Sequence, residues 1–430
     1  MDRFKREASV QSPAAAGGRR YTAPQRWLYL LLFALTSTGW GAIFFPTNQS
    51  ELALAIDQAN LNAEDDVIDL QGLTITLTSP AAGENGLPPI LFDGGHRVTI
   101  EGSGGILERS ANTEASFRLI YIDGGNLTIN ELTLRNGVAE FAGGAIVNHG
   151  TLSLNRCTLS DNEAGSVGGA IYNGADLQIS QSTISHNQAE WGGGIACSNE
   201  ASGTFNMDQS TVSHNSARYD GGGILIDFPG LVGIISNTTI SMNTAGTSGG
   251  GMYIGFFTSI SMLHCTVTQN TADTSMTNEG AGGGIYSEGL SIQATIVAGN
   301  HSYTEPFEII PFEETLEIAP TGVTPTLYDS DVAGIFFSGG NNIIGTKLGS
   351  SGFDGHGVTA QEQTPQVIEG DPDIELTQLN LTVDDILEPT LKDNGGATES
   401  HNPLEGSIVV DLISPQSCIV QVDQRGTIRP

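Results

Sequence analysis

Positive charge is scarce in this 430-residue chain, which has 16 Lys and Arg residues against 48 Asp and Glu residues and a formal net charge of −32. Six of the 16 basic residues lie within the first 26 positions, so the rest of the chain is more acidic still. Such a surface repels phosphate groups, which argues against nucleic acid or an anionic membrane as a partner. Divalent cations or basic groups are the counter-ions we expect.

Cysteine and the sequence motifs of common chemistries are also sparse. The four cysteines form no CxxC pair and no metal-like cluster: Cys157, Cys197, Cys265 and Cys418. Cys157 and Cys265 fall at equivalent positions several repeats apart, too distant to bridge, so we expect buried thiols in strands rather than a disulfide scaffold. P-loop, GxSxG and HExxH motifs are missing, which removes the usual sequence signs of a nucleotide site, a serine hydrolase or a zinc protease.

There is a single long hydrophobic run, from Trp27 to Phe45, and it follows a basic amino-terminal stretch. Its uninterrupted apolar part ends at Leu35, well short of the ~20 residues that a membrane-spanning helix needs. Small residues from Gly39 to Ala42 are typical of a cleavage site, so residues 1–41 are predicted to be an export signal, with an uncleaved anchor as the alternative. We therefore expect a secreted or cell-surface protein.

Glycine, by contrast, is abundant, with 56 residues, and it recurs within the phrase [ST]-T-[LIV]-[ST]-x-N … G-G-[AG]-[IM]. The asparagines of this phrase are separated by 25, 28, 28, 27 and 30 residues: Asn162, Asn187, Asn215, Asn243, Asn270 and Asn300. A repeat of this length, whose exact length varies by a few residues from one repeat to the next, indicates a solenoid whose turns differ only in loop length.

Each period contains three short runs with strand character, such as GGAIYN, DLQIS and STISHN, rich in Ile, Val and Thr. No helical periodicity interrupts them, and the L-x-x-L-x-L ladder of a leucine-rich repeat is absent. We therefore predict an all-β fold, a right-handed parallel β-helix of roughly ten coils with three strands in each.

Coils stacked about 4.8 Å apart place equivalent residues in columns. One column is expected to point into the core: Leu159, Ile184, Val212, Ile240, Val267 and Ile296. The glycines of each phrase mark a tight turn, at which a positive φ is expected. The asparagines are expected at a corner, where their amides bond the backbone and the next coil as a ladder.

The segments that flank the repeats set the expected domain boundaries. Residues 42–114 are predicted to form an N-terminal cap and the first coils, with a short helix that begins at Asn48 or Ser50 and runs to Ala59. The repeats then occupy 115–300. Residues 301–334, which are acidic and contain several prolines, are predicted to be a loop excursion, and 335–430 the last coil and a C-terminal cap.

The last stretch carries a specific motif. PTLKDNGGATESHNPLEGSIVVDLI, followed by CIVQVDQRG and IRP, resembles the bacterial surface-protein family termed choice-of-anchor Q. The matching positions are Asp393, Asn394, Gly395, Gly396, Thr398, His401, Leu404, Gly406, Ser407, Asp411, Cys418, Asp423, Gln424, Arg425, Gly426, Arg429 and Pro430. Family members normally continue beyond the RP at which this sequence stops, which leaves truncation, another anchor or release as alternatives.

Two weaker resemblances accompany it. ELALAIDQANLNAEDDVIDL is similar to a CSLREA-type start without its Cys-Ser-Leu-Arg, and the repeats are similar to polymorphic outer-membrane proteins and other right-handed β-helix repeat proteins. These resemblances imply export and a β-helix fold. The family has no assigned chemistry, so they imply no activity.

Two sets of side chains are candidate metal sites. Asp161, His186 and His214 precede ladder asparagines in adjacent coils and could hold a transition metal or act as acid and base. A solvated polar column is the alternative. Glu190, Asp220 and Asp227 are candidate ligands for Ca²⁺, although no cofactor is required.

Aromatic residues beside the glycine strands are candidate sugar-binding groups. Trp191 and Tyr219, with Asp220 and Asp227 close by in sequence, could stack on sugar rings and bond their hydroxyls. Ordinary packing is the alternative for these rings, as it is for Phe256 and Phe257.

Two functional hypotheses remain. The first is an exported, monomeric, non-catalytic adhesin that binds an extracellular polysaccharide or a surface protein, because a rigid lateral face comes without converging titratable groups. A structural role in an envelope layer is not separable from it by sequence. The second is a polysaccharide lyase or glycoside hydrolase of pectate-lyase-like fold, possibly Ca²⁺-dependent, which the fold and the acidic residues suggest.

Overall fold

In the computed structural model, the part of the chain from Gly41 onward forms one compact unit. The described residues are 41–197, 203–274, 280–304, 326–346, 350–351, 373–409 and 422–427. Residues 1–40 of the predicted export signal, the middle of the predicted acidic excursion and Cys418 lie outside these ranges.

A short helix precedes the coils. Helix α1 (Gln49–Ala59) begins after Asn48, whose side chain accepts a hydrogen bond from the Glu51 N–H, as expected of an N-cap. Its buried face consists of Leu52, Ala55, Ile56 and Ala59. The predicted start, helix and end are therefore confirmed. Among the described residues, the structure has no helix with the length and apolar character needed to cross a membrane.

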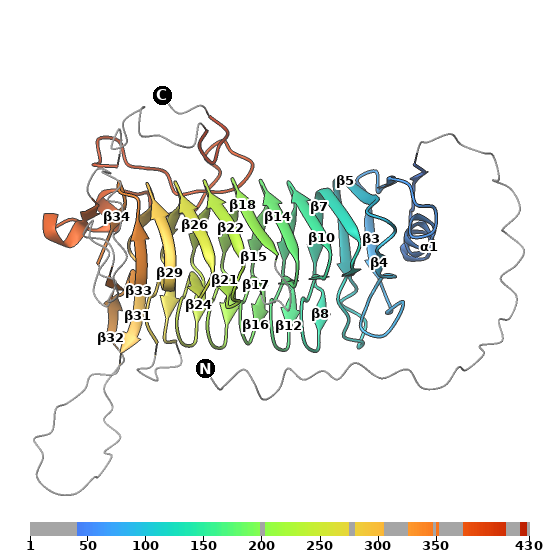
Figure 1. Cartoon of the computed structure of the whole chain (residues 1–430), viewed down its shortest axis with the longest axis horizontal. Helices are drawn as coiled ribbons and strands as arrows, with labels where there is room; N and C mark the ends of the chain where they lie inside the picture. The colour runs from blue at the N-terminus through green and yellow to red at the C-terminus, as the bar shows by residue number, and fades with distance from the viewer. Residues whose placement is uncertain are drawn as a thin grey trace, which may run out of the picture. The chain divides into compact units, whose positions relative to one another are not determined.

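The body is a right-handed parallel β-helix of about ten turns (Figure 1), which confirms the predicted fold. Three strands per coil lie on three faces, here called A, B and C. In a central coil these are β13 (Ile171–Asn173), β14 (Asp176–Ser180) and β15 (Thr183–Ser185), each paired in parallel with the equivalent strand of the next coil.

The remaining strands follow the same order. Face A contains β4 (Ile90–Leu91), β6 (Ile120–Asp123), β9 (Ile146–Asn148), β17 (Ile195–Cys197), β21 (Ile224–Ile226), β25 (Met252–Ile254) and the first parts of β29 (Ile285–Gln293) and β33 (Val332–Ser338). Face B contains β1 (Ile43–Phe44), β2 (Asp66–Asp69), β5 (Arg97–Arg109), β7 (Asn126–Arg135), β10 (Thr151–Asn155), β18 (Thr204–Asp208), β22 (Val232–Ser236), β26 (Ser259–Leu263) and the later parts of β29 and β33, whereas β35 (Ser350–Ser351) pairs with β33 at the end of face A. Face C contains β3 (Thr74–Leu77), the ends of β5 and β7, β11 (Thr158–Ser160), β19 (Thr211–Ser213), β23 (Thr239–Ser241), β27 (Thr266–Thr268), β30 (Ile296–Val297), β34 (Ile343–Ile344) and β36 (Ile374–Glu375).

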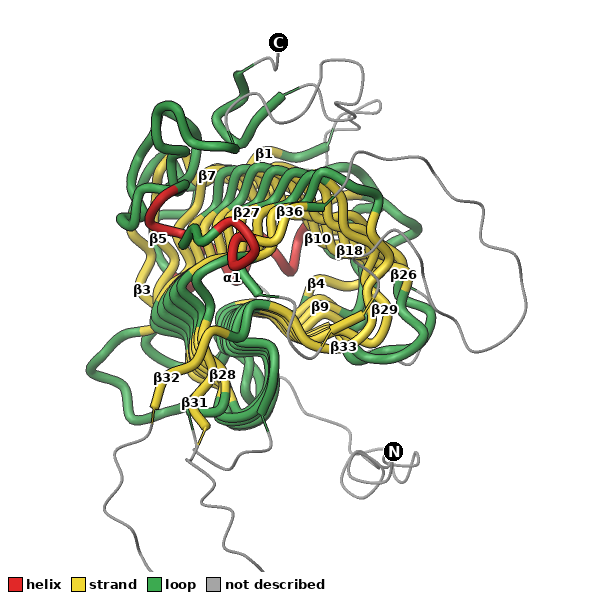
Figure 2. Tube along the Cα trace, turned by 90° about the vertical axis from the view of Figure 1, so that its left-hand side faces the viewer, coloured by secondary structure: helices red, strands yellow, loops and turns green. Residues whose placement is uncertain are grey.

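The coils also build a second sheet, which the sequence analysis did not predict. Its eight short strands are β8 (Val138–Ala139), β12 (Glu163–Ala164), β16 (Gln188–Ala189), β20 (Ser216–Ala217), β24 (Thr244–Ala245), β28 (Thr271–Ala272), β31 (His301–Thr304) and β32 (Thr326–Asp329). They lie in the connection from face C to face A, which projects from the body as a ridge (Figure 2). We call this connection, residues 138–144 and its equivalents in later coils, the ridge.

The inward column is confirmed with one correction. Leu159, Ile184, Val212, Ile240 and Val267 are fully buried and pair in register. The next member is Val297, and the predicted Ile296 instead pairs with Thr266 on the outer side. A one-residue slip moves a side chain to the opposite face of a strand, and counting back three residues from Asn300 gives the right register.

The asparagine ladder is present and buried. From Asn187 onward, each Asn accepts, through Oδ1, hydrogen bonds from the N–H and the side-chain amide of the equivalent Asn in the preceding coil; for the Asn187–Asn215 pair these are 3.0 and 2.9 Å. Each side-chain amide also donates to a backbone carbonyl in the face-C strand of the preceding coil, as Asn215 does to Ile184 O at 2.9 Å. At its end, Asn300 donates to Asp331. The ladder therefore satisfies the polar backbone where the ridge leaves the body.

The glycines of the phrase also behave as predicted. The first of each group has a positive φ, for example 66° at Gly168 and 69° at Gly221. At the next position the neighbouring coil is too close for a side chain: a Cβ on Gly169 would lie 2.1 Å from Gly193 O. These positions need glycine for both conformation and space.

A second ladder of hydrogen bonds, between backbone N–H groups and hydroxyl oxygens of the next coil, includes the positions of Cys157 and Cys265. Ser182 Oγ accepts from Cys157 N at 3.0 Å, and Ser210 Oγ accepts from Ser182 N at 3.2 Å. Cys265 occupies the same corner further along and its N–H donates to Thr295 Oγ1. The predicted equivalence of Cys157 and Cys265 is confirmed, and Cys157, Cys197 and Cys265 are all buried.

The predicted acidic excursion leaves and returns through β31 and β32, which pair antiparallel. Beyond β34, two 3-10 turns (Leu376–Leu379 and Val383–Asp385) cover the last coil, where Ala298, Ile343, Leu376, Ile386 and Leu387 form a small core. The chain then runs back along face C. We call residues 387–409 and 422–427 the strap.

Candidate functional site

The outer surface of face A carries a column of tyrosines. Tyr121, Tyr172, Tyr253 and Tyr286 each follow the inward residue of their strand, at Ile120, Ile171, Met252 and Ile285. Alternation along a strand places them outside the core. All four are half-buried rather than exposed.

At the N-terminal end of this column the side chains meet edge to face. The Tyr121 and His149 rings are 5.8 Å apart, and so are those of His149 and Tyr172. The Arg118 guanidinium lies 5.8 Å from the Tyr121 ring and is paired with Glu84 at 2.8 Å. Burial lowers the pKa of Arg118, but its ordinary value is so high that it stays charged. At this end of the tyrosine column, the positive charge of Arg118 is therefore balanced by Glu84.

At the C-terminal end the tyrosines stack. The Tyr253 and Tyr286 rings lie 5.0 Å apart at 10° to each other, and Tyr286 donates a 2.7 Å hydrogen bond to Glu288. Burial, and then the hydrogen bond to Glu288, raise the pKa of Tyr286 to about 12. Burial, followed by the charges of Asp227 and Asp220, raises the pKa of Tyr253. Both rings therefore stay neutral phenols beside negative charge.

The ridge supplies a second stacked pair. Trp191 and Tyr219, in adjacent coils, have ring centroids 4.6 Å apart at 24°. Arg218 lies over the Tyr219 ring at 5.3 Å and pairs with Glu190 at 3.2 Å. Two of the candidate sugar-binding rings therefore stack directly on each other across coils.

Asp220 and Asp227 connect the ridge with face A. Asp220 is fixed by hydrogen bonds from the Thr247 hydroxyl and from Ser248 N–H, the latter at 2.9 Å. Asp227 follows strand β21, and burial first, then the charge of Asp220, raise the pKa of its carboxyl. Gly255 makes room for it, because a Cβ there would lie 2.1 Å from Asp227 Oδ1.

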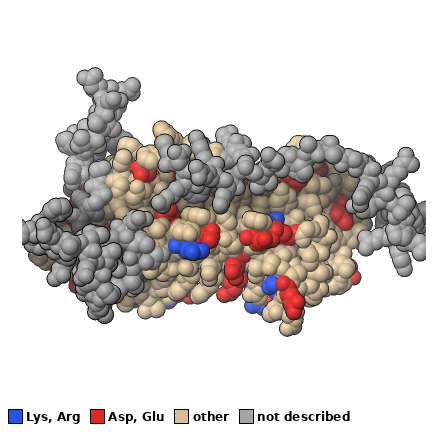
Figure 3. All heavy atoms as spheres, turned by 90° about the horizontal axis from the view of Figure 1, so that it is seen from below, with Lys and Arg blue, Asp and Glu red and all other residues tan. Residues whose placement is uncertain are grey.

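We call these outer side chains of the ridge and of face A together the aromatic–acidic surface. It consists of Trp191, Tyr219, Asp220, Asp227, Tyr253, Tyr286 and Glu288. Figure 3 looks onto the side of the solenoid that carries the ridge, where acidic side chains are interspersed with few basic ones.

The predicted Ca²⁺ ligands do not converge. Glu190 is engaged by Arg218, whereas Asp220 is held by Thr247 and Ser248. In the ranges that the structure describes, no three His, Cys, Asp or Glu side chains come close enough to hold a metal ion. The structure therefore lends no support to a Ca²⁺ site at Glu190, Asp220 and Asp227.

The outer column of Asp161, His186 and His214 lies at a bend with positive φ in each coil, between 57° and 58°. The two imidazole rings stack at 4.8 Å and 6°. Burial, and then the neighbouring His186, lower the pKa of His214, while Glu399 of the strap opposes this. The stack brings the predicted histidines together, but it forms no metal-binding set with Asp161.

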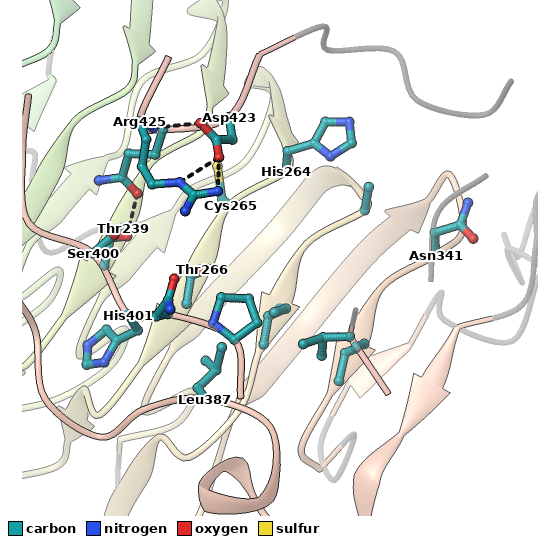
Figure 4. Close-up of a pocket in the computed structure, with 17 residues that line it drawn as sticks. Thr239, His264, Cys265, Thr266, Asn341, Leu387, Ser400, His401, Asp423 and Arg425 are labelled. Carbon is teal, nitrogen blue, oxygen red and sulfur yellow. Dashed lines mark hydrogen bonds and ion pairs between the residues drawn. The ribbon is translucent and has the colours of Figure 1, made fainter. Parts of the chain in front are cut away.

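A cavity of about 250 Å³ lies between the strap and face C (Figure 4). Thr239, His264 and Cys265 contribute from the solenoid, and His401 and Asp423 from the strap. The Asp423 carboxylate already pairs with Arg425, whose Nε donates to Oδ2 at 2.7 Å. The cavity is smaller than most ligand pockets, which span roughly 300–1,000 Å³, and it is best described as a gap in the strap interface.

Tyr253, Tyr286 and Glu288 belong to this surface although the sequence patterns above do not single them out. A signal was available, because a tyrosine stands directly after the inward residue in IYI, IYN, MYI and IYS. Such a position must face outward in a strand. What the sequence did not show is that the ridge brings Asp220 to these rings.

Three comparisons, with family models, with curated proteins and with solved structures, gave no match for this chain. The β-helix repeat architecture is evident from the structure itself. The resemblance of the tail to choice-of-anchor Q stays a prediction.

Proposed function

We propose that this protein is an exported, non-catalytic binding module that holds an extended extracellular polysaccharide along the side of its solenoid. The observation that carries the proposal is the stacking of aromatic rings from successive coils, Trp191 on Tyr219 and Tyr253 on Tyr286. Export is supported by the amino-terminal sequence pattern, and surface attachment by the resemblance of the tail.

Stacked rings suit an extended polymer for a geometric reason. Each coil repeats its outward side chains at the sheet spacing of about 4.8 Å, so rings on neighbouring coils form a platform parallel to the solenoid axis. Aromatic rings offer a large apolar face, and Tyr and Trp add a polar edge that can bond hydroxyl groups. A chain of sugar rings presents the complementary alternation of apolar faces and hydroxyls.

A polysaccharide lyase or glycoside hydrolase is the second candidate. It is favoured by one observation, the partly buried Asp227 carboxyl near both Asp220 and the Tyr253 ring, because a carboxyl with a raised pKa beside a phenol could transfer protons. The binding module is the better-supported proposal, since the stacked rings extend well beyond this one group.

The experiment is to mix the full chain with acidic and neutral polysaccharides and to measure co-sedimentation and chain cleavage together. We expect binding without cleavage, and a loss of about tenfold in affinity for Trp191→Ala/Tyr219→Ala. Phe92→Ala is the matched control, because this ring is 70% exposed and lies between β4 and β5, several coils before the surface. Cleavage abolished by Asp227→Asn would replace the proposal with the enzyme.

A further inference from the structure

The carboxylates of the aromatic–acidic surface are among those that have no cationic partner. Some outer carboxylates of the solenoid are neutralised by an arginine of the adjacent coil, as Glu108 is by Arg135 at 2.7 Å and Glu131 is by Arg156 at 2.6 Å. Among the described residues, Asp220, Asp227 and Glu288 form no ion pair. This part of the surface therefore carries negative charge that the fold leaves without a cationic partner.

The same three carboxylates lie on the surface that carries a stacked aromatic pair, with Asp227 and Glu288 two positions beyond the row of Leu225, Tyr253 and Tyr286. Glu288 accepts a hydrogen bond from Tyr286, and the charges of Asp227, Asp220 and Glu288 all act on Tyr253. The faces of tyrosine rings attract cations, and carboxylates make strong charge-assisted hydrogen bonds with N–H donors. Rings and carboxylates side by side are the chemistry that recognises an organic ammonium group.

We propose that Asp220, Asp227 and Glu288, together with the Tyr253–Tyr286 stack, bind the protonated amino groups of an amine-bearing polysaccharide, one whose amino sugars are not N-acetylated. This inference rests on the proposed function, which it narrows to one class of glycan. The positive charges on the polymer complement a chain whose formal net charge is −32.

An ammonium group fits better than a metal ion. A bare cation such as Ca²⁺ needs several oxygens converging at about 2.3–2.6 Å, and no such group exists among the described residues. An ammonium needs only one carboxylate and a ring face at a time. The carboxylates lie in two coils, Asp220 and Asp227 on either side of β21 and Glu288 in β29 two coils further on, which matches charges spaced along a polymer.

A glycan fits better than a basic peptide because of what adjoins the site. Asp220 lies beside Tyr219, whose ring continues into the Trp191 stack on the ridge. A polymer that places amines at Tyr253 and Tyr286 would thus place further sugar rings on the ridge pair. The burial of Asp227 agrees with this occupant, since a bound cation would stabilise its ionised form.

The test compares two oligosaccharides of equal length with the full chain, an oligomer of glucosamine and its fully N-acetylated form. Affinities are measured by calorimetry at mildly acidic pH, at which the amines are protonated, and at two salt concentrations. The variants are Asp227→Asn/Glu288→Gln and, as a charge-matched control, Glu114→Gln/Glu163→Gln, which removes two exposed carboxylates elsewhere. Thermal unfolding of each variant confirms that it is folded.

We expect the glucosamine oligomer to bind at least about tenfold more tightly than the acetylated one, with salt weakening it. That preference should disappear in the site variant and persist in the control. Equal binding of both oligomers would overturn the amine inference and leave the glycan-binding proposal standing. Binding of neither oligomer, with binding of a polylysine peptide instead, would overturn both.

Discussion

Thr239 donates a 2.7 Å hydrogen bond to Gln424 Oε1, across 185 residues of sequence. The amide end of Gln424 donates to Ser210 O and Thr211 Oγ1, both at 3.1 Å, so one side chain links the strap to two coils of face C. The outward hydroxyl residues beneath the strap, such as Thr211 and Ser241, are fully buried. The tail therefore acts as a lateral brace on the solenoid as well as a cover for its end.

Replacement of Gln424 by alanine should release the strap. The variant loses hydrogen bonds on both sides of the amide and leaves the buried Thr239 hydroxyl without its acceptor, which we expect to cost about 1–3 kcal/mol. Hydrogen exchange should then accelerate in residues 398–402 and 422–427 but not in the α1 helix. Gln378→Ala, which removes only an exposed bond to Glu375, is the control. Unchanged exchange in the strap would show that Gln424 does not hold it.

Mild acid should loosen the same segment. His401 is buried, and its Nδ1–H donates to Glu388 O at 2.9 Å, so the neutral ring carries its proton there and Nε2 is buried without a hydrogen-bond partner. Burial lowers the pKa of His401. Because the unfolded imidazole binds a proton more readily, the stability from the neutral ring is present above the unfolded pKa and is lost as pH falls through the folded one.

The measurement is strap exchange at neutral pH and at a pH below the folded pKa of His401. We expect faster exchange in acid for the wild type and a smaller difference for His401→Gln, which keeps a donor but cannot titrate. His96→Gln, at an exposed site beside Asp65, should leave the acid effect intact. An acid effect that is equal in His401→Gln would assign it to another group.

Loss of one ladder asparagine should be strongly destabilising. In Asn215→Ala, the buried Asn187 amide loses its acceptor, and the carbonyl of Ile184 loses its donor. We expect a loss of about 2–4 kcal/mol in the free energy of unfolding, because unsatisfied polar groups remain buried. Denaturant unfolding of this variant is compared with that of Gln178→Ala, an exposed face-B residue. Equal midpoints would mean that the ladder contributes little.

Cys157 should tolerate serine but not valine. Its thiol donates to Ile129 O and Asn155 O at 3.3 and 3.4 Å, as the Ser182 hydroxyl of the next coil donates to Ser180 O at 2.7 Å. Valine has no donor, so we expect Cys157→Val to lose about 1–2 kcal/mol more than Cys157→Ser in thermal or denaturant unfolding. The reverse order would show that the corner is governed by apolar packing.

The thiol itself should be unreactive in the folded protein. Burial raises the pKa of Cys157 to about 11 and that of Cys197 to about 12. Since the thiolate is the reactive form, alkylation near neutral pH should require unfolding. Rapid labelling of either cysteine in the native state would contradict the buried geometry.

The coil architecture was predictable because it rests on local, repeated signals. The asparagine spacing identified the coils, and the N-cap at Asn48 identified the first helix. The predicted inward column was wrong only at Ile296. Two adjacent apolar residues stand there, so either could face the core, and the structure pairs Val297 with the inward Val267. The short strands of the ridge escaped prediction because two residues carry too little pattern to identify a strand.

The periodicity, the inward columns, the glycine turns and the asparagine corner follow from the amino-acid pattern alone, because each depends on a residue's position within its own coil. Which outer side chains meet depends instead on the three-dimensional path of the chain. The charge of Asp220 acts on Tyr253 because the ridge leads into face A, and Gln424 contacts Thr239 because the strap runs back along face C. Such contacts depend on the path of the chain between coils, which no local pattern encodes.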